Sequence, residues 1–214
     1  MPMIRDYFIF IQNPRKNSIS MKQRNAFISF ISVLLITYVL VFFISFIPSN
    51  IAFNVKDIVT TRDSKNLLFL LIIPLYEELL FRLGLKISAL HISFSISLLI
   101  SSIIVNLVFF NELDLLKFYL FSFMLALPFF LGFKNFVYSE KIEKILLKRY
   151  NYLFFSTIIL FALSHFLYLG FDFSAFLTYL VYGYSLSFLR VTTKFLYCVI
   201  LHFIFIAPVI FQAL

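Results

Sequence analysis

The stretch FISFISVLLITYVLVFFISFI, residues 27–47, decides the fold class of this chain. It carries no charged side chain, and its length meets the roughly 20 helical residues that a hydrocarbon core requires. It is too long for the apolar core of a signal peptide, and no small-residue cleavage site follows it. We therefore predict a retained transmembrane helix here.

The rest of the chain has the composition of an integral membrane protein. Of its 214 residues, 62% are hydrophobic and 13% are charged, whereas a soluble domain has about 25% charged residues. The short alternating segments of a transmembrane barrel are absent from the sequence. The expected fold class is all-α, a polytopic transmembrane bundle of about seven helical spans in a single domain, residues 1–214.

The distribution of apolar residues and basic residues predicts the spans and their orientation. The predicted spans are 27–47, 67–90, 92–110, 115–133, 152–169, 173–189 and 195–212. With the N-terminus in the cytoplasm, 14 of the 18 Lys and Arg residues fall inside, as the positive-inside rule requires. Residues 1–26 then form a basic cytoplasmic tail, and the polar stretch 134–149 a short cytoplasmic helix. Topology explains the net charge of +8, so no nucleic-acid partner is expected.

Ionisable side chains deep in a span cost several kcal/mol, so each one indicates pairing or function. Those deep in the predicted spans are Glu77, Glu78, Arg82, His165 and His202, and His91 lies near a boundary. Glu78 and Arg82 are four residues apart, in the order that favours an ion pair on one helix face. We expect these two to neutralise each other.

Glu77 is the residue whose charge this pairing leaves unexplained. It points about 100° away from Glu78 and has no basic partner at helical spacing. Pro74 removes one backbone hydrogen bond and can kink the span, which would admit water beside Glu77. We predict that Glu77 is a general base in a polar site that it shares with His165 and His202.

These segments resemble the CAAX protease and bacteriocin-processing family of intramembrane endopeptidases, also called the Abi family. Its first motif, Glu-Glu-x-x-x-Arg, matches Glu77, Glu78 and Arg82, and its second, Phe-x-x-x-His, matches Phe161 and His165. The resemblance covers roughly residues 67–206. Within it, residues 92–133 are expected to be an inserted helical pair.

The third family motif, His-x-x-x-Asn, is matched only at His202, because Ile206 stands at the Asn position. The family's Asn accompanies the histidine as an oxyanion donor, and loss of one such donor lowers a rate by about 100- to 1000-fold. The resemblance therefore implies an impaired site unless another amide substitutes. Asn106 and Asn151 are the candidates.

The resemblance implies a glutamate-type peptidase that cleaves a membrane-associated peptide or protein substrate. In that reading Glu77 activates a water with help from His165, and His202 donates to the developing oxyanion. Glu78 and Arg82 hold the site together. The expected partners are membrane lipid and the substrate, and no cofactor is expected.

Other hydrolytic chemistries have weaker patterns in the sequence. A zinc protease of the His-Glu-x-x-His type is disfavoured because the motif is absent. A metal ion bound by Glu77, His165 and His202 is an alternative, since these residue types can be ligands. A serine protease would use Ser185 with His202 as base. Cys198, the single cysteine, is expected to be an inert thiol.

Two alternatives to an enzyme stay open at this stage. Ile206 favours a non-catalytic membrane scaffold or peptide-binding protein that keeps the polar cluster as a structural feature. In a transporter, Glu77 would be a proton-coupled carboxylate.

Overall fold

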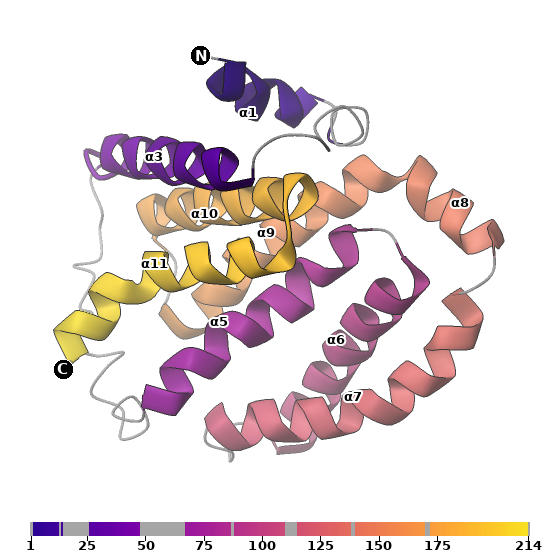
Figure 1. Ribbon diagram of the computed structural model, residues 1–214. Coiled ribbons are helices and arrows are strands. Elements are labelled where there is room, and N and C mark those ends of the chain that lie inside the picture. The colour runs from indigo at the N-terminus through magenta and orange to yellow at the C-terminus, as the bar shows by residue number, and fades with distance from the viewer. Residues whose placement is uncertain are drawn as a thin grey trace.

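The computed structural model describes residues 2–12, 14, 26–47, 67–86, 88–109, 115–137, 140–169 and 172–213. All regular structure in these ranges is helical, which confirms the all-α fold class (Figure 1). The α-helices are α1 (Pro2–Gln12), α3 (Ala26–Ile44), α5 (Leu67–Phe81), α6 (Ala89–Phe109), α7 (Leu115–Val137), α8 (Glu140–Lys148), α9 (Tyr150–Leu169), α10 (Phe173–Thr192) and α11 (Phe195–Ala213). A short 3-10 helix, η1 (Leu83–Leu85), follows α5.

Six of the seven predicted spans coincide with α3, α6, α7, α9, α10 and α11 to within a few residues. Helix α8 lies within the polar stretch 134–149. Two described helical segments, Ala26–Ile44 and Leu90–Phe109, are long and apolar enough to cross a membrane. The length and apolar composition of these two segments are weak evidence for membrane association.

The predicted span 67–90 is wrong in its second half. Helix α5 ends at Phe81, and η1 turns the chain before α6 begins at Ala89. The carbonyls at this turn find buried donors from elsewhere: Arg190 donates to Arg82 O at 3.2 Å, and the Tyr150 hydroxyl donates to Leu85 O at 3.1 Å. A helix can end inside a protein when its last carbonyls are satisfied in this way.

The helices form one large packed group with a helical pair beside it. Helix α10 packs against α3, α9 and α11, and α5 contacts α9 and α11. Helices α6 and α7 pair with each other along their lengths (Figure 1). Tyr76 of α5 joins the two parts by packing with Leu98 of α6 and with Tyr119 and Ala126 of α7.

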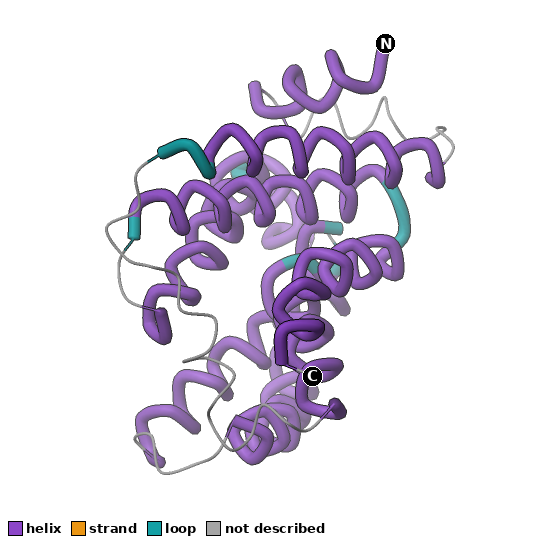
Figure 2. Tube along the Cα trace, turned by 90° about the vertical axis from the view of Figure 1, so that its left-hand side faces the viewer, coloured by secondary structure: helices purple, strands orange, loops and turns teal. Residues whose placement is uncertain are grey.

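The predicted basic tail, residues 1–26, contains a helix that the sequence reading does not include. Helix α1 lies at the edge of the bundle beside α3 (Figures 1 and 2). Its Tyr7 and Phe10 are buried, and the Tyr7 hydroxyl is 2.6 Å from Ser185 Oγ. Phe10 packs edge-on against Phe154 and Phe188. This part of the tail is therefore a packed element of the fold.

Candidate active site

Three helices bring the predicted site residues together. Glu77 comes from α5, His165 from α9 and His202 from α11. Glu77 Oε1 lies 3.9 Å from His165 Nε2, and Glu77 Oε2 lies 3.4 Å from His202 Nε2. The side chains of Glu77 and His165 are 16% and 18% exposed, whereas that of His202 is 5% exposed. The cluster is therefore mostly enclosed but can be reached from outside at Glu77 and His165.

Glu78 and Arg82 form the ion pair that their spacing predicts. Arg82 Nη1 is 3.3 Å from Glu78 Oε1, and both side chains are fully buried. The same carboxylate oxygen lies 2.9 Å from His202 Nδ1. Glu78 therefore links the arginine to the histidine, a contact that the sequence pattern does not predict.

The acceptors around each imidazole determine which nitrogen carries a proton. His165 Nδ1 is 2.8 Å from the Phe161 carbonyl, which can only accept, so Nδ1 is the donor. In the neutral ring the lone pair of His165 Nε2 then faces Glu77. His202 Nδ1 donates to Glu78 by the same reasoning, which leaves His202 Nε2 facing the second carboxylate, Glu77.

A proton between His202 Nε2 and Glu77 Oε2, which lie 3.4 Å apart, would make this contact attractive. Without one, a nitrogen lone pair would face a carboxylate oxygen. With one, the charges of Arg82, Glu78, His202 and Glu77 sum to zero, whichever of the last two residues holds the proton. This neutrality matters because an uncompensated buried charge costs several kcal/mol.

Phe161, the aromatic residue of the second motif, contacts the arginine and both histidines of the cluster. The Arg82 guanidinium lies 3.8 Å from its ring centroid, a cation–π geometry. The His165 and His202 rings meet it edge-on at centroid distances of 4.7 and 5.8 Å. The Arg82 nitrogens have no hydrogen-bond partner among the described residues, so the aromatic face and the Glu78 carboxylate are what stabilise the cation.

Close packing of α9 on α10 holds Phe161 in place. A Cβ at Gly183 of α10 would lie 3.1 Å from a Phe161 ring carbon and 3.3 Å from Ile158 Cγ2. The bare glycine therefore allows the approach that fixes the Phe161 ring against Arg82.

Tyr179 belongs to the cluster and is missing from the sequence prediction. Its ring stacks on the His165 imidazole with a centroid distance of 4.0 Å and an interplanar angle of 25°. No motif identifies it, because Tyr is common in this chain and aromatic residues make up 21% of it.

The structure does not bring together Ser185 and His202, the residues of the serine-protease alternative. Ser185 is buried, and its Oγ lies 2.6 Å from the Tyr7 hydroxyl and 2.7 Å from Thr37 Oγ1. Both nitrogens of His202 face glutamates instead. Cys198 is buried, and its thiol donates to the Leu186 carbonyl at 3.5 Å.

Neither candidate for the missing amide replaces it. Asn106 is exposed on α6, and Asn151 lies 14 residues before His165, about 21 Å along a helix axis. Ile206, one turn beyond His202, is half-buried and offers no donor. His91, the third histidine, lies in the first turn of α6 with its Nδ1 3.4 Å from Lys86 O, outside the cluster.

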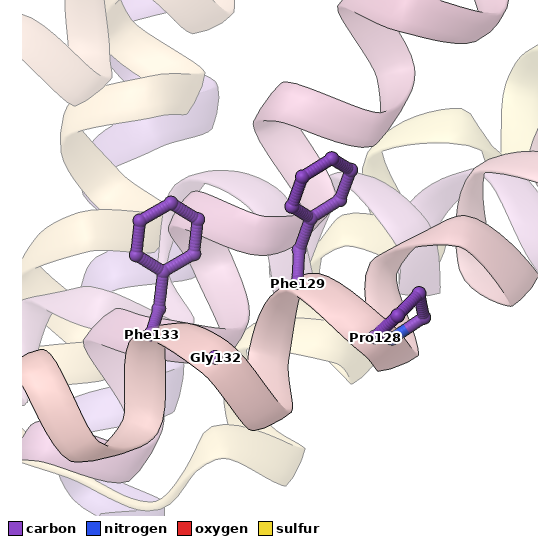
Figure 3. Close-up of a pocket in the computed structure, with 4 residues that line it drawn as sticks. All are labelled: Pro128, Phe129, Gly132 and Phe133. Atoms are coloured by element: carbon purple, nitrogen blue, oxygen red, sulfur yellow. The ribbon is translucent and has the colours of Figure 1, made fainter.

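Neither a group of metal ligands nor the pocket on α7 provides a second site among the described residues. Within the described ranges, no three His, Cys, Asp or Glu side chains are arranged to hold a metal ion. An open apolar pocket is lined by residues of α7 alone, Pro128, Phe129, Gly132 and Phe133 (Figure 3). None of these belongs to the cluster around Glu77.

Comparison with protein-family models, with characterised proteins and with solved structures gives no match for this chain.

Proposed function

We propose that this chain is a multi-pass membrane protein that hydrolyses a peptide bond of a membrane-associated substrate, in the manner of the CAAX protease and bacteriocin-processing family. The observation that carries the proposal is the convergence of Glu77 with the Nε2 atoms of His165 and His202. An enclosed carboxylate between two imidazoles from separate helices is suited to moving protons.

The exterior of the helices supports the membrane setting. Large apolar side chains are exposed on α3, α6 and α7, with Phe43 at 64%, Leu107 at 69% and Met124 at 67%. Apolar exposure of this extent on several elements is rare in soluble monomers. In a bilayer these side chains contact lipid.

The spacing of Glu77 and His165 suits the binding of a water molecule. Glu77 Oε1 and His165 Nε2 are both acceptors and lie 3.9 Å apart. One water can reach hydrogen-bond distance, about 2.8 Å, of both atoms at once, with one O–H directed at each. Both bonds increase the negative charge on the water oxygen and make it a better nucleophile.

Hydrolysis then follows with this chain's own groups. The water oxygen attacks the carbonyl carbon while its proton moves to Glu77, and a tetrahedral oxyanion forms. The carbon–nitrogen bond breaks as Glu77 returns the proton to the leaving amine, so one water is consumed for each bond cleaved. With Glu77 acting as the base, the proton between the two residues is on His202 Nε2, where it stabilises the oxyanion, and Glu78 keeps that imidazole oriented.

Ile206 favours a second candidate, a non-catalytic protein that binds a peptide at the same cluster. Such a protein would keep the neutral charge network and the enclosed site. It would bind peptides without releasing products.

Purified full-length protein in detergent, incubated with a synthetic peptide library, tests the proposal. We expect new peptide termini by mass spectrometry with wild type, and about 100- to 10,000-fold fewer with Glu77→Gln, because the general base is lost. His91→Gln, a histidine outside the cluster, is the matched control and should cleave as wild type does. Absence of cleavage by folded wild type, or equal cleavage by Glu77→Gln, would refute the peptidase proposal.

A further inference from the structure

The oxyanion of the proposed hydrolysis has one charged donor in this site, His202 Nε2. A second donor would increase the rate, because fixed donors placed where charge develops are usually the largest contribution to it. Ile206 supplies none, and the amides of Asn106 and Asn151 lie elsewhere. A second donor therefore has to come from another side chain in contact with the cluster.

Tyr179 is placed to be that donor. Its ring lies face to face on the His165 imidazole at 4.0 Å, so the phenol is held on the same group that helps to bind the water. The ring also contacts the edge of Phe161, at a centroid distance of 6.4 Å.

The Tyr179 hydroxyl is available for such a role. Other buried tyrosines use their hydroxyls inside the fold: Tyr7 bonds Ser185, Tyr76 bonds Ser102 and Tyr150 bonds the Leu85 carbonyl. Among the described residues, no partner accepts from or donates to the Tyr179 hydroxyl, and the side chain is half-buried. A phenol in this position can donate to a substrate without breaking a bond of the fold.

We propose that Tyr179 is a catalytic residue whose hydroxyl donates a hydrogen bond to the oxyanion, in place of the amide that is absent at Ile206. The phenol keeps its proton throughout, so no proton is transferred and no co-reactant is needed. This inference rests on the proposed hydrolase function.

Tyr182 provides a matched control for the role of the hydroxyl. It lies on the same helix three residues later, and its ring also stacks face to face, but on Phe205, with a centroid distance of 4.3 Å and an interplanar angle of 16°. Removing either hydroxyl leaves the ring stacking in place. Only at Tyr179 is the stacked partner a site histidine.

The test measures kcat and KM on the best-cleaved library peptide, using the full chain in detergent. Tyr179→Phe should lower kcat by about 100- to 1000-fold, the usual loss for one oxyanion donor, and leave KM within twofold. Tyr182→Phe should leave both constants unchanged. Adding Ile206→Asn to Tyr179→Phe should recover part of the lost kcat, because an amide is returned to the site.

The outcomes separate this inference from the proposed function. If wild type cleaves, Glu77→Gln does not, and Tyr179→Phe keeps the wild-type kcat, the donor role of Tyr179 is overturned while the peptidase stands. If Tyr179→Phe and Tyr182→Phe lose kcat equally, the loss reflects packing of α10, and the donor role is again overturned. If folded wild type cleaves nothing, the peptidase proposal fails and this inference fails with it.

Discussion

At the scale of single residues, Glu78 is the residue on which the charge network depends. Its carboxylate lies 3.3 Å from Arg82 Nη1 and 2.9 Å from His202 Nδ1. All three side chains are buried. Removing one member of a buried pair leaves the other charge uncompensated, at about 3–5 kcal/mol.

Arg82→Met should therefore lower the free energy of unfolding by about 3–5 kcal/mol. The measurement is denaturant unfolding in detergent, followed by circular dichroism. The double variant Glu78→Gln/Arg82→Met removes both charges and should be less destabilised than Arg82→Met alone. A double variant that is destabilised by the sum of the two single changes would show that the pair is not compensating buried charge.

Residue spacing predicts part of the candidate site. The four-residue interval predicts the Glu78–Arg82 ion pair, and the 100° offset predicts that Glu77 points elsewhere. Spacing says nothing about contacts between helices, so the hydrogen bond from His202 to Glu78 comes only from the packing of α11 on α5. The sequence does not predict a role for Tyr179 for the same reason, because that role depends on the stacking of its ring on His165 of another helix.

At the scale of helices, Gly183 is the position that sets the approach of α9 and α10. Gly183→Ala places a methyl group 3.1 Å from the Phe161 ring, which is closer than ordinary van der Waals contact. The Phe161 ring has to move, and this ring is in contact with Arg82, His165 and His202.

We expect Gly183→Ala to lower kcat for peptide cleavage by about tenfold, because the ring has to shift by a few tenths of an ångström and a displacement of 1 Å can lose about 100-fold. Gly132→Ala on α7 is the matched control, because its Cβ would meet no atom of the described residues within 4 Å. Cleavage assays of both variants at equal folded concentration check this. Equal activity of the two variants would contradict a positioning role for the α9–α10 contact.

Hydrophobic length predicts most helices but not where α5 ends. Apolar residues continue beyond Phe81 at Leu83 and Leu85, so the predicted span extends to residue 90. The turn at η1 exists because Arg190 and Tyr150, more than 60 residues later in the chain, satisfy its carbonyls. The sequence does not predict helix α1, because this helix is short and its burial depends on Tyr184 and Phe188 of α10.

At the scale of the whole molecule, the chain combines an apolar exterior with a distribution of basic residues from which the topology is predicted. Cys198 is the single cysteine and is buried, so the native chain is a suitable background for surface labelling. Lys117 and Lys144 are both exposed and lie on opposite sides in the predicted topology.

Lys144→Cys should react with a membrane-impermeant maleimide only in inverted vesicles, and Lys117→Cys only in intact cells. Gel-shift labelling of the two variants measures this, with the unsubstituted chain as the unlabelled control. Labelling of both positions from the same side would contradict the seven-span topology. Reaction of the unsubstituted chain would contradict the burial of Cys198.

In the proposed mechanism, Glu77, between His165 and His202, activates water to split a peptide bond. Cleavage of the best library peptide in water enriched in oxygen-18 tests it most directly, by mass spectrometry of the product with the new C-terminus. We expect one heavy oxygen in that carboxylate for each bond cleaved by wild type, and loss of the labelled product in Glu77→Gln. A labelled product that forms equally with Glu77→Gln, or a folded wild-type protein that forms none, would contradict it.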